Sequence, residues 1–194
     1  MASKKILVIN GHPQEGSLNH SLSLAYQKGA MESGADVKHI NIADLRFDPN
    51  LAGGYSHRTE LEPDLLQAWQ DILWADHIVW VHPVWWGGMP AIMKGFIDRV
   101  FLPGMAFKYR ENSEWWDKLL IGKSAHIIST LHQPGWYYRL VYARPSVNAL
   151  RKSTVQFCGI GPVKVTLLEV KREPNEKEIQ KRIEQIYLSG LKLQ

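Results

Sequence analysis

The sequence has very little cysteine, and this scarcity limits its chemistry. Cys158 is the only cysteine in the 194 residues, so no disulfide can form within the chain. The 8 histidines show neither the H-x-x-x-H nor the H-E-x-x-H spacing of a zinc site, so we predict no metal. Cys158 itself lies in an apolar segment, which favours packing over reactivity.

Long hydrophobic runs and long runs of basic residues are also absent. No apolar stretch approaches the length of a membrane span, and the stretch after the basic start is too short for a signal peptide. The net charge is +4, but the basic residues are dispersed, whereas a nucleic-acid site needs a basic stripe. We therefore expect no nucleic-acid partner, no membrane insertion and a cytoplasmic location.

What the sequence does contain is a regular alternation of strand and helix patterns. A near-continuous apolar run at residues 5–10 is typical of a strand buried in a parallel sheet, and we predict further strands at residues 36–42, 77–82, 124–130 and 163–170. Helical patterns follow at residues 17–33, 63–75, 91–101, 145–157 and 176–191. Residues 43–62, 102–116 and 131–143 are predicted to be irregular.

This alternation predicts one doubly wound α/β domain over residues 1–194, with three layers and a five-stranded parallel sheet. The strand order 2-1-3-4-5 is favoured over a six-stranded dinucleotide-binding fold. In that order the ligand crevice opens between the first and third strands. The loops at residues 11–19 and 82–90 should then lie side by side.

The first of these loops, GHPQEGSLN, matches neither G-x-G-x-x-G nor a Walker loop. It places Ser17, Asn19 and free backbone N–H groups at a helix start, where the helix dipole favours an anion. His12 can donate a further hydrogen bond. The alternative is an ordinary capped helix.

The second loop, HPVWWGGMP, is unusual because it holds two tryptophans, two prolines and two glycines. Prolines stiffen a loop, glycines allow close approach of a ligand, and tryptophans supply a flat apolar wall. The composition favours a planar aromatic ligand over a phosphate or a metal. The alternative is that the tryptophans fill the core.

The motifs resemble those of the flavodoxin-like NAD(P)H:quinone oxidoreductases, which include DT-diaphorase, bacterial general-stress oxidoreductases and ancillary flavoproteins of potassium-efflux systems. The most specific segment is HPVWWGGMPAIMKGFIDRVFLPGMAFKY at residues 82–109. Gly-His-Pro with Ser-x-Asn in the first loop, and Phe-Cys-Gly before the last strand, also match. The resemblance covers most of the chain.

The resemblance implies a flavin held by three loops. The residues expected to bind it are His12, Ser17, Leu18, Asn19, Pro83, Val84, Trp85, Trp86, Gly87, Thr130, Leu131 and His132. FMN is favoured for so short a chain, with FAD as the alternative. NADH or NADPH is the expected electron donor.

The third loop departs from the family pattern of Thr-Thr-Gly-Gly followed by a Tyr and a His. This chain reads STLHQPG from Ser129 and has no histidine at the later position. Tyr137, Tyr138 and Arg144 are the candidates for contacts to the polar edge of the flavin and for catalysis. Each of these side chains could equally serve packing or surface contacts.

The implied activity is a ping-pong, two-electron reduction of a quinone or a similar planar acceptor. Azo, nitro or flavin reduction on the same scaffold is one alternative, and a flavin-binding regulatory subunit of a transporter is another. Steady NAD(P)H turnover without a partner would favour the enzyme. The resemblance also implies a homodimer.

Overall fold

Five parallel strands form the central sheet of the computed structural model, which describes residues 3–57 and 59–193. In spatial order they are β2 (Asp36–Asn41), β1 (Lys5–Asn10), β3 (His77–Pro83), β6 (Ser124–Leu131) and β7 (Val163–Glu169). All neighbouring strands are parallel. The predicted α/β class and the predicted order of the five strands are confirmed; the labels β6 and β7 arise because two short strands lie between them in the sequence.

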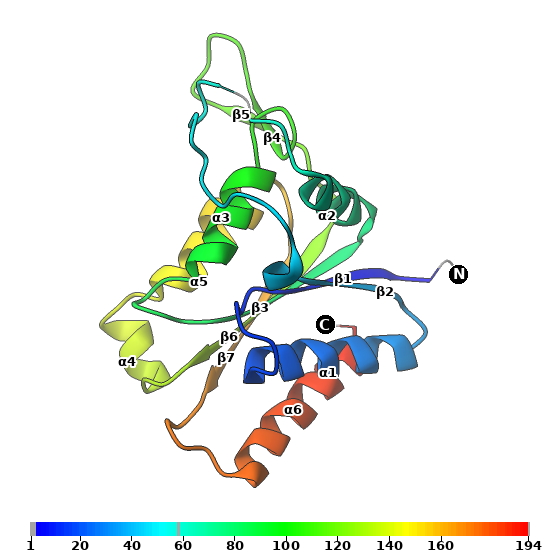
Figure 1. The fold of residues 1–194 in the computed structure, drawn as a ribbon, viewed down its shortest axis with the longest axis vertical. Helices are drawn as coiled ribbons and strands as arrows, with labels where there is room; N and C mark the ends of the chain where they lie inside the picture. Colours follow the sequence, from blue (N-terminus) through cyan, green and yellow to red (C-terminus); the bar gives the residue numbers. More distant parts are fainter. Residues whose placement is uncertain (1–2, 58, 194) are drawn as a thin grey trace.

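Helices cover both faces of the sheet, which explains why its inner strands are apolar on both sides (Figure 1). On one face lie α1 (Leu18–Glu32) and α6 (Glu176–Leu191), with the cluster that contains Ile6, Val8 and Leu168. On the other lie α2 (Pro63–Trp74), α3 (Ala91–Val100) and α5 (Pro145–Leu150). The result is a three-layer arrangement in which every residue of β3 is buried.

Three segments differ from the sequence prediction. The region predicted to be irregular at residues 102–116 begins an antiparallel hairpin of β4 (Phe107–Tyr109) and β5 (Trp116–Lys118). Tyr109 faces Trp116 across this hairpin, and such aromatic pairs stabilise short strands. The third irregular region contains α4 (Gly135–Leu140), and the helix predicted at residues 145–157 passes after Leu150 into a π-helical segment, Arg151–Val155.

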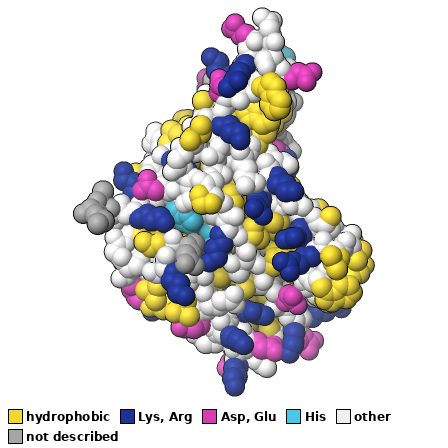
Figure 2. Space-filling view, turned by 180° about the vertical axis from the view of Figure 1, so that it is seen from behind, with side chains coloured by type: hydrophobic (Ala, Val, Ile, Leu, Met, Phe, Trp, Pro, Cys, Tyr) yellow, Lys and Arg dark blue, Asp and Glu magenta, His cyan; other side chains and the backbone are white. Residues whose placement is uncertain are grey.

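Charged side chains are spread over the face shown in Figure 2, with groups of hydrophobic side chains at its right edge and below the projection at its top. Among the helices of the described residues, none is both long enough and apolar enough to cross a membrane. The domain prediction spans residues 1–194, of which 1, 2, 58 and 194 lie outside the described residues.

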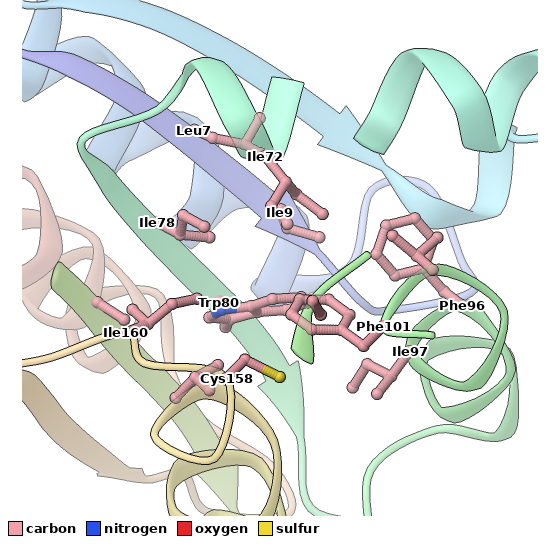
Figure 3. Packing of buried hydrophobic residues seen from close by; sticks show 14 of the residues in the cluster. Leu7, Ile9, Ile72, Ile78, Trp80, Phe96, Ile97, Phe101, Cys158 and Ile160 are labelled. Carbon is pink, nitrogen blue, oxygen red and sulfur yellow. The ribbon is translucent and has the colours of Figure 1, made fainter. Parts of the chain in front are cut away.

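Trp80 occupies the centre of the larger core cluster (Figure 3). It lies on β3, is fully buried and packs its ring against Phe96 and Phe101 of the α3 side. Cys158 belongs to the same cluster, and burial raises the pKa of its thiol to about 12. The cysteine therefore packs, as its apolar context predicts.

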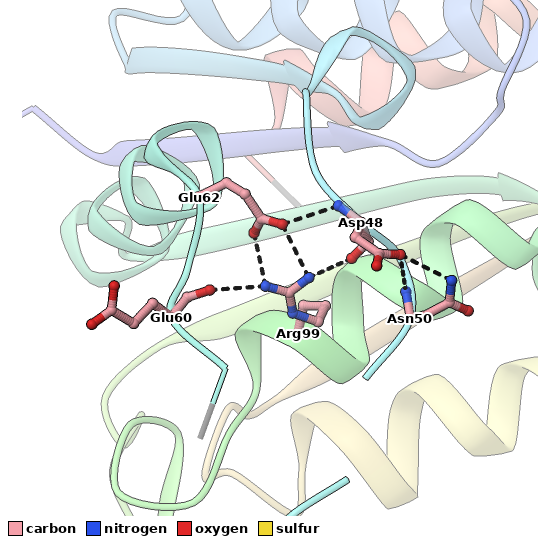
Figure 4. A network of polar contacts seen from close by, with 5 residues as sticks. All are labelled: Asp48, Asn50, Glu60, Glu62 and Arg99. Atoms are coloured by element: carbon pink, nitrogen blue, oxygen red, sulfur yellow. Dashed lines mark hydrogen bonds and ion pairs between the residues drawn. The ribbon is translucent and has the colours of Figure 1, made fainter. Parts of the chain in front are cut away.

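Arg99 fastens the long connection between β2 and α2 to the body of the domain (Figure 4). Its guanidinium is buried on α3 and donates to the backbone carbonyls of Asp48 and Glu60 and to the carboxylate of Glu62. A bidentate guanidinium suits this set of acceptors, which a single ammonium could not serve. The connection is therefore held in place although much of its surface is exposed.

Candidate functional site: a crevice at the carboxyl end of the sheet

The first loop is folded by its own side chains onto the start of α1. Gly11 N–H donates to Val81 O at 2.8 Å, which holds the loop against β3. His12 N–H donates to the Asn10 side chain at 3.2 Å, and Ser17 Oγ accepts from His20 N–H at 3.2 Å as the N-cap of α1. The loop thus ends at a capped helix start, where partial positive charge favours an anion.

The second loop makes a tight turn at Trp86-Gly87. Trp85 and Gly88 exchange backbone hydrogen bonds of 2.9 and 2.8 Å, and φ is +51° at Trp86 and +75° at Gly87. Positive φ at both central residues is the type I′ pattern, which bulky side chains rarely adopt. Trp86 is fully exposed, with a relative accessibility of 106%. Trp85 is more covered and meets His12 edge-on, 5.3 Å between ring centroids.

The alternative that these two tryptophans fill the core is therefore wrong, since both rings are exposed. A turn that holds a large residue at positive φ and keeps its ring in water carries backbone strain without any packing in return. Such strain is typical of ligand sites.

The third loop is linked to the first through Asn19 and Thr130. Their side chains lie 3.1 Å apart in a buried hydrogen bond, so the start of α1 is fixed to the end of β6. Thr130 O also accepts from Val84 N–H at 2.8 Å, which ties in the tryptophan loop. His132 then donates from Nδ1 to Val170 O at 3.0 Å. One residue, Thr130, thereby sets the positions of the other two loops.

A buried histidine supports the base of the tryptophan loop. His82 Nδ1 lies 2.9 Å from Pro83 O, and its Nε2 lies 3.0 Å from Ser129 Oγ. Burial lowers the pKa of His82 to about 4, so the ring is neutral at neutral pH. A neutral ring has one N–H, and this geometry places it on Nδ1 toward the carbonyl while Ser129 donates to Nε2.

Two adjoining cavities open between the three loops. The larger, of about 800 Å³, is lined by Val84, Trp85, Trp86, Gly87, His132, Gln133, Tyr142, Pro145 and Arg172. The smaller, of about 270 Å³, lies toward α1 and is lined by His12, Leu18, Asn19, Pro83, Val84, Trp85, Thr130, Leu131, His132, Val170, Lys171, Arg172, Pro174 and Ile179. Because four lining residues are shared, an elongated ligand can occupy both.

The structure brings the predicted cofactor-binding residues together. All of them except Ser17 line one or both cavities. Ser17 instead caps α1 beside the smaller one. The flat wall of Trp85 faces both cavities, while the helix start lies at the smaller one. The shape and the chemistry therefore fit a planar ring system with a phosphate tail.

The predicted catalytic residues lie elsewhere. Tyr138 is fully buried against Leu131 and Val147, and burial raises the pKa of its hydroxyl. Tyr137 packs edge-on between the rings of Trp136 and Tyr142. Arg144 lines a separate pocket with α4. None of the three lines the two cavities, whereas Tyr142 does.

Two basic residues at the site were not among the predicted ones. Lys171 and Arg172 follow β7 and line the smaller cavity, and Arg172 also lines the larger. Lys171 is paired with Glu178, while Arg172 has no ion pair among the described residues. The sequence feature that could have identified them is a basic pair directly after a predicted strand, at the edge of the sheet where ligands bind.

Comparison with known proteins agrees with this architecture. A family model described as "Flavodoxin-like fold" matches residues 4–188. The chain belongs to this family. Its flavodoxin-like fold is shared with the crystal structure of Smu.1420 from Streptococcus mutans UA159, with 29% identity, a TM-score of 0.82 and coverage of 97% of this chain and 99% of the other.

Two curated relatives carry oxidoreductase names. An "Uncharacterized NAD(P)H oxidoreductase" of Escherichia coli strain K12 is 27% identical over 87% of this chain and 85% of its own length. A "Ribosyldihydronicotinamide dehydrogenase-like protein" of Penicillium crustosum is 32% identical over 68% of this chain. That match spans 58% of the fungal protein's length.

Proposed function

We propose that this flavodoxin-like protein is a flavin-dependent NAD(P)H oxidoreductase that reduces quinones or similar planar acceptors by two electrons. The observation that carries the proposal is the pair of joined cavities, with a tryptophan wall at one end and a capped helix start at the other. The names of the curated relatives support the same reaction class.

FMN is the cofactor we propose, with FAD as the alternative and NADH or NADPH as the donor. When bound, the flavin supplies the hydride and electron transfer. In this proposal the start of α1, with His12 and Arg172, would hold the phosphate, and Pro83, Val84 and Trp85 would hold the ring. The Asn19–Thr130 hydrogen bond keeps these loops in register.

The remaining residues orient the acceptor and exclude water. Tyr142, His132 and Gln133 line the open end of the larger cavity, where a planar acceptor would stack. Tyr142 can donate a proton to an acceptor oxygen there. Tyr137 supports the Tyr142 ring and Tyr138 anchors α4, so we propose that these two tyrosines act through position. The alternative, a direct contact of Tyr137, Tyr138 or Arg144 with flavin or substrate, stays a prediction.

We also propose a cytoplasmic homodimer. The β4–β5 hairpin stands away from the body of the domain (Figure 1) and exposes Tyr109 and Trp115. Large exposed aromatic surface of this kind is typical of an interface. Sedimentation of the flavin-loaded protein as a monomer at all concentrations would contradict the homodimer without affecting the reaction.

The deciding experiment is to add FMN and FAD to the purified protein and to follow NAD(P)H oxidation with a water-soluble quinone. We expect a yellow protein and steady turnover. A protein that takes up neither flavin would overturn the proposal, and tight flavin binding with negligible turnover would favour a regulatory module. Mass spectrometry of the released flavin distinguishes FMN from FAD.

Arg172→Gln tests the placement of the phosphate. Loss of one partly exposed cationic contact should weaken FMN binding about fivefold. Riboflavin has the same ring without the phosphate, so its affinity should not change. Lys28→Gln on α1 removes a charge far from the site and serves as the control. Equal losses for FMN and riboflavin would contradict the assignment.

A further inference from the structure

Helix α4 presents large apolar side chains to solvent. Trp136 and Leu140 are 63% and 79% exposed, and Val141, which follows them, is also exposed. The inner side of the helix already packs against the domain, because Tyr138 is fully buried against Leu131 and Val147. The exposed side chains are therefore not needed for the core. We call Trp136, Arg139, Leu140 and Val141 the α4 patch.

The patch adjoins a basic pocket of about 570 Å³. Val165 and Leu167 of β7 contribute apolar lining, and Arg139 and Arg144 supply two guanidinium groups. Within the described part of the chain, neither arginine forms an ion pair. The acidic group in the pocket is Glu169, whose carboxylate lies close to Gly135. Positive charge therefore exceeds negative charge around an apolar surface.

Figure 1 shows α4 at the left of the molecule, and this side is at the right in Figure 2, where Lys and Arg side chains lie beside a hydrophobic group. Exposed Trp and Leu bordered by arginine is the composition of elements that rest on a bilayer surface. Lipid headgroups with negative charge complement the arginines, and the acyl boundary accepts the apolar side chains.

A second copy of this chain fits the same surface less well. A two-fold contact centred on α4 would bring Arg139 and Arg144 toward their own copies, and juxtaposed like charges oppose such a contact. We propose that the α4 patch docks the protein on the surface of an anionic lipid bilayer. No part of the chain needs to span the bilayer for this.

The position of the patch has a consequence for the site. Tyr142 follows Val141 directly and lines the open end of the larger cavity. A bilayer docked on α4 therefore lies beside the mouth of the cavity, within reach of acceptors dissolved in lipid. This consequence rests on the proposed function, whereas the docking itself does not.

Cosedimentation of the full-length protein with lipid vesicles tests the docking without any turnover. We expect binding to vesicles of phosphatidylcholine mixed with phosphatidylglycerol, weaker binding to phosphatidylcholine alone, and loss of binding at high salt. Arg139→Gln should weaken binding to the anionic vesicles about fivefold. The double variant W136S/L140S should weaken it more than tenfold.

Matched variants on the other layer of the molecule provide the controls. Lys28→Gln and Leu188→Ser change an exposed cation on α1 and an exposed leucine on α6, and both should leave vesicle binding unchanged. Equal binding of the wild type to both kinds of vesicle, or no binding to either, would overturn the proposal. So would an α4-patch variant that changes the oligomeric state in sedimentation but not the binding to vesicles.

The consequence for catalysis is tested separately. In anionic vesicles that carry a long-chain quinone, Leu140→Ser should slow NAD(P)H oxidation, while turnover with a water-soluble quinone stays the same. If the protein binds vesicles but reduces no quinone in either form, the docking stands and the proposed function fails.

Discussion

Trp86 combines a strained backbone conformation with a side chain that makes little packing contact. Its φ of +51° is a left-handed conformation that costs an L-residue about 1–2 kcal/mol, and its exposed ring gains no packing in return. Replacement by glycine should relieve the strain, whereas replacement by alanine should keep it. We expect Trp86→Gly to be more stable than Trp86→Ala by about 1 kcal/mol in urea unfolding.

Both Trp86 variants lose the ring, so both should bind flavin or acceptor more weakly than the wild type and to a similar degree. This separates the role of the ring in binding from its role in the turn. If the glycine variant were the less stable of the two, the turn would not be strained. If neither variant changed binding, the ring would not belong to the site.

At the scale of single residues, position along the chain was enough to predict which side chains lie at the crevice, while their binding of a cofactor stays a prediction. His12, Asn19 and Trp85 could be placed because each follows a strand whose end lies at the ligand crevice. Gln133 was missed because nothing local marks a side chain that reaches the cavity from its loop, whereas for Arg172 the basic pair after β7 was an available signal. Tyr138 shows the converse, since a polar side chain near the expected position turns into the core.

At the scale of elements, the crossing of α1 and α6 depends on two glycines. A Cβ on Gly190 would meet the backbone carbonyl of Tyr26, and one on Gly29 would meet that of Tyr187. Alanine in a helix is normally favoured over glycine by about 1 kcal/mol, so propensity alone predicts that Gly190→Ala stabilises. We expect the opposite, a loss of about 1–3 kcal/mol, because the helices must move apart.

Ser189→Ala is the matched control for this crossing. It changes the neighbouring position, where the serine hydroxyl only donates to the Gln185 carbonyl within the same helix. Its unfolding free energy should stay within about 0.5 kcal/mol of the wild type. A Gly190→Ala protein at least as stable as the wild type would show that the close approach of the two helices is not required.

The elements were predictable where the pattern of apolar residues is clear, as in the apolar runs of β1 and β3 and the helical spacing of α6. The β4–β5 hairpin was missed because three-residue strands are too short to show alternation. The ion pair of Arg110 with Asp117 and the stacking of Trp116 on Phe157 stabilise it. Helix α4 was missed because its single turn and a half is rich in aromatic residues, which resemble a binding loop in sequence. The periodicity of apolar residues thus predicted the central sheet and its helices, but it did not predict the β4–β5 hairpin or α4.

For the whole molecule, three buried or partly buried histidines make the stability fall in mild acid. Burial lowers the pKa of His39 to about 4 and that of His82 to about 4. Burial, with the nearby charges of Lys4, His126 and Lys164, lowers the pKa of His77 to about 3. In the unfolded chain each of these groups titrates near 6.5.

The sign of the effect follows from proton binding. Between about pH 6.5 and pH 4 the unfolded chain binds more protons than the native protein, so the unfolding free energy falls as the pH falls. Each histidine should contribute about 1–2 kcal/mol of loss between pH 7 and pH 5. Urea midpoints measured across this range should therefore shift steadily downward with acid.

His82→Asn isolates one of these contributions. The Asn amide can donate to Pro83 O, as Nδ1–H of the histidine does, but it does not titrate. The variant should lose about 1–2 kcal/mol less than the wild type between pH 7 and pH 5, whatever its stability at pH 7. Parallel pH profiles for the two proteins would mean that His82 has the same pKa, near 6.5, in the native and unfolded states. The lowered pKa that keeps the ring neutral beneath the tryptophan loop in mild acid would then be wrong.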